Sequence, residues 1–335
     1  MAASPRAVGV GIAGVGFMGR THLAAYAGHA RAEVRALFDP STRAATAGNL
    51  ITGSSAADQL LATLPRVESF EALLARSDIE LVSICTPTDT HVALVRQAIA
   101  AGKHVLVEKP TSLDAAEIEA LAAEADAARV LVMPAHCMRF WPAWAWMAEA
   151  VRTRRFGRPR RASFRRMGAR PSWSQDFYLD VRRSGGALVD LHIHDADFVR
   201  FVFGEPAEVE ARGTRMHVNA RYRFADGAVV EAEGGWMEDA SFQFTMTAAI
   251  ECADATLDFC LGRDPELMVV RGGREEAVRA GTDYPLGSGY DHEVGAMLDA
   301  VLAARNGRAT PPVGLRDAAA TQRLLDHEAA QVSSE

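Results

Sequence analysis

Three glycines at the spacing Gly14-x-Gly16-x-x-Gly19 constrain the fold of this chain more than any other feature. They follow directly on apolar residues 7–13, which are typical of a buried strand, and they open a helical stretch. In such a turn the first glycine allows the tight bend, the second lets the backbone approach a pyrophosphate, and the third lets helix and strand pack closely. The amides at the helix N-terminus then face the anion. The pattern predicts a dinucleotide-binding loop made by Gly14, Gly16, Phe17, Met18 and Gly19.

A carboxylate follows at the distance that a dinucleotide-binding fold requires. Asp39 ends a second apolar run, residues 34–38, twenty positions beyond Gly19. There a carboxylate accepts hydrogen bonds from both ribose hydroxyls and repels a 2′-phosphate, so we predict NAD in preference to NADP. Arg43 lies near enough in the sequence to favour NADP instead. The alternative for Asp39 is a helix cap or a turn, which the sequence Asp39-Pro40-Ser41 also suits.

Short apolar runs alternate with alanine-rich helical stretches through the first part of the chain. The predicted strands are residues 7–13, 34–38, 81–85, 104–107 and 130–133, and the predicted helices are residues 20–29, 69–75, 91–101 and 114–128. Strand–helix alternation implies right-handed crossovers and a doubly wound parallel sheet. We therefore expect a Rossmann domain over residues 1–135.

The pattern changes after about residue 157, where strands follow one another with few helices between them. The predicted strands are residues 160–167, 208–216, 220–224, 229–235, 242–251, 256–261 and 267–270, with helices at 290–304 and 315–330. Asp226-Gly227 is a hairpin signal. We expect an α+β domain over residues 136–335 with a large, open, mostly antiparallel sheet, whose last helix could pack back on the first domain. Because an open sheet face usually needs covering, we also expect a homodimer or homotetramer joined through this sheet.

Composition and charge exclude several classes of protein. A net charge of -7 argues against a nucleic-acid binder, and we attribute the basic residues 152–166 to solvated faces and ion pairs. There is no charged-then-apolar leader and no apolar stretch of roughly 18 residues, so we expect no membrane association and a cytoplasmic location. Cys85, Cys137, Cys252 and Cys260 have no zinc-ribbon spacing and are expected to be reduced thiols.

A lysine follows the predicted strand at residues 104–107, within Glu108-Lys109-Pro110. Ligands gather beyond the carboxyl ends of strands in an open α/β sheet, so Lys109 should face the crevice. A half-buried lysine beside a carboxylate and a cofactor can hold a substrate hydroxyl or relay a proton. The alternative is an ordinary surface lysine at a strand end.

The stretch GGALVDLHIHDAD, residues 185–197, concentrates two histidines and three carboxylates among apolar spacers. If residues 187–203 form one helix, at about 100° per residue, Asp190, His194 and Asp197 share one face and His192 points elsewhere. Asp190 would then orient the His194 ring and stabilise its imidazolium. We expect Asp197 to be structural and His192 to be a satisfied surface or interface histidine.

The same stretch has a competing interpretation as a metal site. His192-x-His194 with Asp195 and Asp197 resembles the His-x-His of metal-dependent hydrolases, which converges on one ion when it lies on a strand. On a helix the two rings diverge by about 200°. The Gly-Gly start and the continuation to Gly204 favour a helix, so we predict no metal.

Several motifs occur together in one order along nearly the whole chain. They are Gly14-x-Gly16-x-x-Gly19-x-x-His22, Thr86-Pro87 with His91, Glu108-Lys109-Pro110, and Gly185-Gly186-x-x-x-Asp190-x-x-x-His194-x-x-Asp197. Arg155-Phe156-Gly157 and Tyr290-x-x-Glu293 are weaker matches. This combination resembles the Gfo/Idh/MocA family, which includes glucose–fructose oxidoreductase and inositol dehydrogenase.

The resemblance implies a Rossmann domain, a C-terminal domain with an open antiparallel sheet, and oxidation or reduction of a sugar or polyol carbon by a pyridine nucleotide. It carries the family's catalytic lysine, aspartate and histidine over to Lys109, Asp190 and His194. Either His194 or Lys109 could be the immediate base. The resemblance also implies cofactor contacts, which we assign to Thr86, Pro87, His91, Glu108 and Lys109, and a cis peptide at Lys109-Pro110.

Substrate contacts are expected from the segment after the last strand of the first domain. In the resembling family this region borders the substrate, so His136 and Arg139 are candidates to bind a sugar hydroxyl. Trp173 and Tyr178 could stack on a sugar ring or simply cover the core. A catalytically idle, nucleotide-bound sensor is the competing function, and the complete set of Lys109, Asp190 and His194 favours the enzyme.

Overall fold

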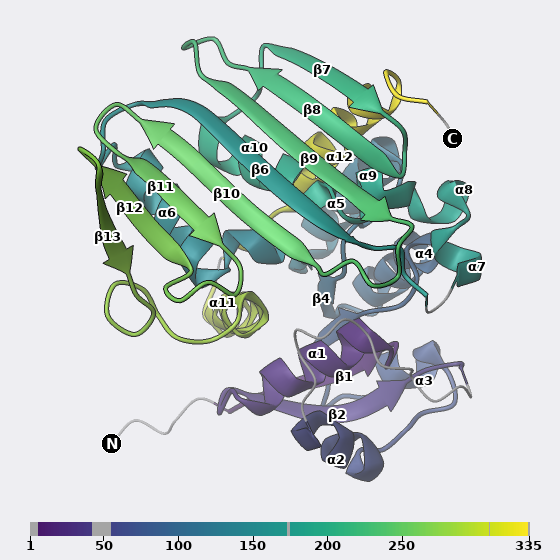
Figure 1. Cartoon of the computed structure of the whole chain (residues 1–335). Coiled ribbons are helices and arrows are strands. Elements are labelled where there is room, and N and C mark those ends of the chain that lie inside the picture. Colours follow the sequence, from purple (N-terminus) through teal and green to yellow (C-terminus); the bar gives the residue numbers. More distant parts are fainter. Residues whose placement is uncertain (1–5, 42–54, 173–174, 308, 334–335) are drawn as a thin grey trace. The chain divides into compact units, whose positions relative to one another are not determined.

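The computed structural model describes the 335-residue chain except residues 1–5, 42–54, 173–174, 308 and 334–335 (Figure 1). The chain divides into two compact units. The first comprises Met1–Ala135 with Tyr290–Ala320, and the second comprises His136–Gly289 with Thr321–Glu335. Of the helices in the described ranges, none combines the length and the apolar composition that a membrane span requires.

The first unit is built on a parallel sheet of five described strands in the order β2-β1-β3-β4-β5 (Figure 1). The strands are β1 (Val8–Ala13), β2 (Ala32–Phe38), β3 (Leu81–Ile84), β4 (His104–Val107) and β5 (Val132–Pro134). The predicted doubly wound parallel sheet is therefore confirmed. The strand order reverses between β1 and β3, whose ends pair at Ala13 and Ile84. In such sheets the ligand crevice lies beyond the carboxyl ends of the strands at this reversal.

Helices complete the first unit and bury its strands. They are α1 (Phe17–Ala27), α2 (Ser55–Thr63), α3 (Phe70–Leu74), α4 (Thr88–Ala100), α5 (Ala115–Ala128) and α11 (Gly289–Ala304). Every residue of β1 and β3 is buried, as expected for a parallel sheet covered on both faces. The core also includes Leu315, Ala318 and Ala319, from the first turns of α12 (Leu315–Ala329).

The second unit is built on an eight-stranded sheet in the order β13-β12-β11-β10-β6-β9-β8-β7. The strands are β6 (Pro159–Ala169), β7 (Glu208–Gly213), β8 (His217–Arg223), β9 (Val229–Met237), β10 (Thr245–Cys252), β11 (Thr256–Cys260), β12 (Leu267–Arg271) and β13 (Arg274–Val278). Only the β6–β9 pairing is parallel among these strands, so the predicted mostly antiparallel sheet is confirmed. Two expected boundaries were wrong, because a turn at Thr214 ends β7 at Gly213 and lets β8 begin at His217.

One face of this sheet packs against α6 (Pro142–Arg152), α9 (Gly186–Asp190) and α10 (Ile193–Phe203) (Figure 1). Trp144 is fully buried there, with its ring 4.7 Å from Phe198 and 5.7 Å from Phe259. The opposite face carries charged pairs at alternate positions, such as Arg165–Glu233 and Arg221–Glu231. This part of the face is therefore charged, and the expected homo-oligomer through this sheet remains a prediction.

Residues 187–203 do not form the one continuous helix that we predicted. Helix α9 ends at Asp190, Leu191 and His192 form a turn, and α10 begins at Ile193. Shorter elements flank this region: the 3₁₀ turn η1 (Cys137–Arg139), α7 (Gln175–Tyr178) and α8 (Val181–Ser184). The prediction that Asp190 and His194 share one face assumed a single continuous helix, so it does not hold.

Candidate active site

The glycine loop after β1 has the backbone geometry that its sequence predicts. Gly14 has φ +85°, and a Cβ atom there would lie 2.6 Å from the carbonyl oxygen of Cys85. A Cβ on Gly19 would lie 1.9 Å from the carbonyl oxygen of Gly14, so this position also requires glycine. A Cβ on Gly16 would meet no protein atom within 4 Å. The backbone at Gly16 thus faces open space, as close approach of a ligand demands.

The N-terminus of α1 fits a bound anion. Gly16 is its N-cap residue and provides no side-chain hydrogen bond, and the first turn of this described helix contains no acidic residue. The positive end of the helix dipole is therefore not neutralised by its own first turn. This arrangement fits the pyrophosphate of a dinucleotide.

The Asp39 carboxylate lies beside the glycine loop. Its Oδ2 accepts a hydrogen bond from the amide of Val15 at 2.7 Å, and its Oδ1 accepts one from the amide of Ser41 at 2.7 Å. Asp39 therefore makes the turn contact that the sequence offered as one alternative, and its predicted contact with a ribose remains a prediction. A carboxylate has about four acceptor positions, so the contacts from described residues leave two for hydroxyl groups. Arg43, the residue that could favour NADP, lies outside the described residues.

His91 connects the ends of two neighbouring strands of the first unit. Its Nε2 lies 2.7 Å from the carbonyl oxygen of Thr86, after β3, and its Nδ1 lies 2.8 Å from that of Pro110, after β4. The ring is 1% exposed. Burial lowers the pKa of His91, although the two carbonyl contacts oppose this effect. Both ring nitrogens are thus engaged within the protein, and the predicted cofactor contact of His91 remains a prediction.

Glu108 and Lys109 follow β4, next to a second buried histidine. Glu108 is 6% exposed; its Oε1 lies 3.0 Å from Nε2 of His22, and its Oε2 accepts a hydrogen bond from the Lys109 amide at 3.1 Å. Burial raises the pKa of Glu108, but His22 and Lys109 lower it further, to a value below the ordinary one. The Lys109-Pro110 peptide is cis, as the resemblance predicted.

In the second unit, His194 and Asp190 lie on different helices. Asp190 is the last residue of α9, and His194 lies in the first turn of α10. Both side chains are partly exposed. The His194 Nδ1 lies 3.8 Å from the Sγ of Cys137, on η1. This thiol is a neighbour of the candidate base that the sequence did not indicate.

His192 is fully buried, which corrects our expectation of a surface or interface histidine. Its Nε2 lies 3.1 Å from the Tyr222 hydroxyl and 3.1 Å from Oε2 of Glu328, and Tyr222 donates a hydrogen bond to the same carboxylate at 2.7 Å. Burial lowers the pKa of His192, but Glu328 raises it above the ordinary value. Gly234 of β9 makes room for the ring, since a Cβ there would lie 2.7 Å from the Cβ of His192.

The contacts of His192 in the structure are with the protein groups Tyr222 and Glu328. Within the part of the chain that the structure describes, no three His, Cys, Asp or Glu side chains gather as a metal site would require. The four cysteines, all among the described residues, are reduced thiols, as predicted.

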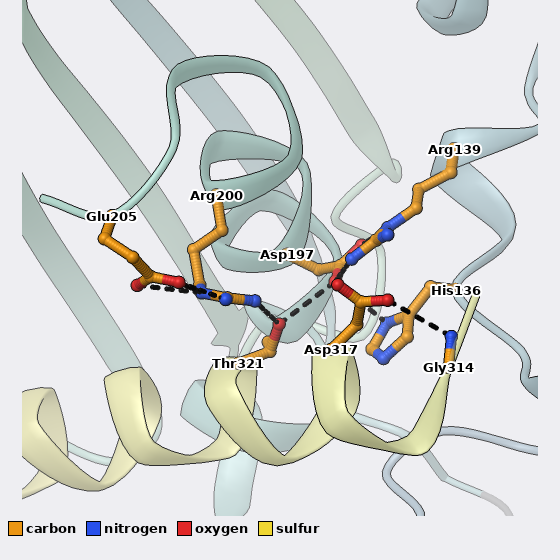
Figure 2. Close-up of polar contacts among 8 residues, drawn as sticks. All are labelled: His136, Arg139, Asp197, Arg200, Glu205, Gly314, Asp317 and Thr321. Carbon is orange, nitrogen blue, oxygen red and sulfur yellow. Dashed lines mark hydrogen bonds and ion pairs between the residues drawn. The ribbon is translucent and has the colours of Figure 1, made fainter.

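Figure 2 shows Asp197 at the centre of a chain of polar contacts. Asp197 accepts hydrogen bonds from Arg139 at 2.8 and 2.7 Å and from the Thr321 hydroxyl at 3.0 Å, and it lies 3.7 Å from Nδ1 of His136. Thr321 in turn accepts a hydrogen bond from Arg200 at 2.9 Å. Burial raises the pKa of Asp197, but His136 and Arg139 outweigh it and bring the value to about 2. His136 and Arg139 therefore have a carboxylate partner, and their predicted sugar contacts remain predictions.

Two family models match this chain. The oxidoreductase family model with the NAD-binding Rossmann fold matches residues 8–136, and the GFO/IDH/MocA C-terminal domain model matches residues 144–257. The chain belongs to the Gfo/Idh/MocA oxidoreductase family. The resemblance drawn from the motifs is confirmed, and so is the expectation of an NAD-binding domain.

Curated relatives include sugar and inositol dehydrogenases. Inositol 2-dehydrogenase of Rhizobium meliloti is 33% identical over 202 residues, covering 60% of this chain and 57% of that protein. UDP-N-acetylglucosamine 3-dehydrogenase of Acidithiobacillus ferrooxidans is 34% identical over 204 residues, covering 61% of this chain and 57% of that protein. The alignments thus span less than two thirds of the length of these two relatives.

Solved structures of the family cover nearly the whole chain. The structure of the UDP-N-acetylglucosamine 3-dehydrogenase matches with a TM-score of 0.77 and 25% identity, over 97% of this chain and 98% of that one. Levoglucosan dehydrogenase in complex with NADH and levoglucosan matches with a TM-score of 0.82 and 20% identity, over 97% and 98%. The second match shows a shared fold.

The lysine content of this family member draws attention to Lys109. The sequence contains only two lysines, Lys103 and Lys109, among 36 lysines and arginines. The Lys103 ammonium donates hydrogen bonds to the carbonyl oxygens of Arg76 and Ile79 at 2.9 and 2.8 Å. Arginine remains protonated in proteins, whereas a lysine can lose a proton. The retention of lysine at 109 in so arginine-rich a chain is a signal that was visible in the sequence and that our sequence-based reasoning missed.

Two other predictions concern the second unit. The Tyr178 ring packs edge-on against Trp236, with centroids 5.6 Å apart, while Trp173 lies outside the described residues. Their contact with a sugar remains a prediction. The basic residues 152–166 form ion pairs, as expected; Arg166 makes a buried one with Asp195 at 2.8 Å. The other pairs are Arg152–Glu149, Arg158–Asp226 and Arg165–Glu233.

Proposed function

We propose that this oxidoreductase is an NAD-dependent dehydrogenase of a sugar, an inositol or a related polyol, acting on a secondary hydroxyl. The observation that carries the proposal is the arrangement around Lys109. Its backbone follows β4 at the carboxyl edge of the sheet, and Glu108 joins that backbone to His22 of α1, the helix that starts at the glycine loop. The substrate classes of the relatives support a polyhydroxy compound.

We assign proton transfer to His194 and orientation of its ring to Asp190. The Nδ1 of His194 is in contact with Cys137, so Nε2 is the nitrogen that we assign to the substrate. Bound NAD would supply the hydride acceptor. The C–H bond breaks with its electron pair leaving as hydride, the O–H proton passes to His194, and the carbon is left as a carbonyl. Lys109 donates a hydrogen bond to the same oxygen and stabilises the negative charge that develops on it.

We assign the preference for NAD to Asp39. The two acceptor positions that remain on its carboxylate match in number the 2′- and 3′-hydroxyls of the adenosine ribose of NAD. A 2′-phosphate in place of one hydroxyl would bring a second negative charge to this carboxylate, which is unfavourable.

We further propose that two copies of the chain associate through the second unit's open sheet face. The alternating charges at Arg165–Glu233 and Arg221–Glu231 are self-complementary when the face meets a copy of itself. Light scattering at micromolar concentration tests this proposal. A monomer at that concentration would rule it out.

The test of function is NADH formation, followed by its near-ultraviolet absorbance, across a panel of sugars and polyols. We expect turnover with at least one member, and we expect His194→Ala to lower that turnover at least about a hundredfold while NAD binding is retained. His327→Ala, at an exposed histidine of α12, is the matched control and should keep full activity. Near-normal turnover of His194→Ala would remove His194 from the mechanism. A flat response across the panel by a protein that binds NAD would favour the idle sensor.

A further inference from the structure

The backbone on the N-terminal side of Lys109 is held by a buried chain of polar groups. His22, on α1, is 0% exposed and has its Nδ1 2.7 Å from the Ser83 hydroxyl on β3 and its Nε2 3.0 Å from Glu108. The other oxygen of Glu108 accepts the Lys109 amide hydrogen at 3.1 Å. Helix α1, strand β3 and the end of β4 are thereby joined through one histidine.

The backbone on the C-terminal side of Lys109 is held by a second buried histidine. His91, on α4, contacts the carbonyl oxygen of Pro110 at 2.8 Å and that of Thr86 at 2.7 Å. Carbonyl oxygens only accept hydrogen bonds, and a neutral imidazole has only one N–H. Because burial lowers the pKa of His91, the neutral ring donates to one of the two carbonyl oxygens and packs against the other. Glu108 and Lys109 are the charged groups that act on it, the first favouring and the second opposing its protonation.

The two histidines therefore act on the residues directly before and after Lys109. With Glu108 and Pro110 anchored, the position of the Lys109 Cα atom is set by α1, β3 and α4 together. A catalytic group must be held within roughly 0.5 Å of its productive position, and displacement by about 1 Å can cost on the order of a hundredfold in rate. Lysine needs such support because its four-carbon stem is flexible.

We propose that His22 and His91 are positioning residues that hold the Glu108-Lys109-Pro110 segment from its two sides and thereby set where the Lys109 ammonium meets the substrate oxygen. This rests on the proposed function for the role of Lys109. The proposal goes beyond that function because it assigns a positioning role to His22 and His91, neither of which is one of the proposed reacting groups.

The presence of only two lysines makes the proposal directly measurable. Reductive methylation with ¹³C-formaldehyde gives one methyl resonance for each lysine side chain, so Lys109 can be observed with Lys103 as an internal reference. We would compare the wild type with His22→Phe and His91→Phe, which keep a planar ring but lose the polar contacts of the imidazole. The matched control is His104→Phe, at the opposite end of the same strand, where the ring accepts a hydrogen bond from the Leu131 amide at 2.9 Å.

We expect each of the two variants to shift the Lys109 resonance and its titration midpoint while the Lys103 resonance stays in place. We also expect kcat to fall at least about tenfold with the dissociation constant for NAD changed less than about threefold. His91→Gln, which can donate a hydrogen bond, should recover part of the loss. His104→Phe should leave Lys109 unchanged.

An unchanged Lys109 resonance in folded variants overturns the proposal, even if kcat falls, because the histidines would then act only on stability. If His22→Phe does not fold, Glu108→Gln tests the same link, since it keeps the size of the side chain and removes its charge. A wild-type protein that oxidises nothing but whose Lys109 resonance responds to both variants would refute the proposed function and leave the positioning role intact.

Discussion

Replacing Asp197 with asparagine should destabilise the second unit by about 2–4 kcal/mol at pH 7. The change keeps the size of the side chain and removes its charge, which leaves Arg139 buried without its bidentate partner. Lowering the pKa of Asp197 from 3.8 to about 2 corresponds to about 2–3 kcal/mol of stability, at about 1.4 kcal/mol for each pKa unit. Loss of one partner from a buried pair costs roughly 3–5 kcal/mol, so the two estimates meet at about 3 kcal/mol.

The pH dependence of this effect has a definite sign. The pKa of Asp197 is lower in the folded protein than in the unfolded chain, so its stabilising contribution is fully present above the unfolded value, about 3.9. It is lost as the pH falls through about 2. The difference in stability between the wild type and Asp197→Asn should therefore be constant from pH 7 to about 5 and shrink below about pH 4.

Urea unfolding followed by tryptophan fluorescence measures this difference. All five tryptophans lie in residues 136–289, so the signal reports on the unit that contains Asp197 even if the two units unfold separately. Asp226→Asn is the control, because Asp226 pairs with Arg158 at 3.2 Å on the surface and should contribute less than about 1 kcal/mol. A loss below about 0.5 kcal/mol for Asp197→Asn, or a loss that does not shrink in acid, would contradict this reasoning.

Three further substitutions test the dinucleotide loop and the buried histidine. Gly16→Ala should leave the melting temperature unchanged, because the new methyl group meets no protein atom within 4 Å, yet weaken NAD binding at least about tenfold in a titration. Asp39→Ala should raise the ratio of kcat/KM with NADP to kcat/KM with NAD at least about tenfold. An unchanged ratio would show that another group determines the cofactor preference. Gly234→Ala should destabilise the second unit by about 1–3 kcal/mol, because its Cβ would lie 2.7 Å from the Cβ of His192, and unaltered urea unfolding would contradict the packing described for that ring.

The first unit could be predicted closely from the sequence because its signals are local. Strands such as β4, predicted at residues 104–107 and found at His104–Val107, are continuous apolar runs buried on both faces. The glycine loop is equally local, since the turn at Gly14 and the close contact at Gly19 depend on neighbouring backbone. Strand β13 was not predicted because its sequence lacks an alternation of apolar and polar residues. Four of its five residues are exposed, at the edge of the sheet.

The region around His194 could not be predicted to the same extent, because its shape depends on residues distant in sequence. Placing residues at about 100° intervals around a helix is valid only for one continuous helix, and the turn at His192 divides residues 187–203 into two helices. That turn places the ring beside Tyr222 and Glu328, which lie 30 and 136 positions further along the chain. The residue pattern within 185–197 therefore could not predict that Tyr222 and Glu328 contact His192.

Two polar networks of the second unit, around His192 and around Asp197, depend on the C-terminal helix. Glu328 is the counter-ion of buried His192, and Thr321 donates to Asp197 and accepts from Arg200. Both belong to α12, whose first turns lie in the core of the first unit. A fragment comprising residues 136–289 would keep every strand of the sheet but leave His192 without its carboxylate, and an unpaired buried charge is among the most destabilising defects in a protein. The second unit is therefore built from two separate stretches of the chain, and its stability depends on the residues of α12 that follow the first unit.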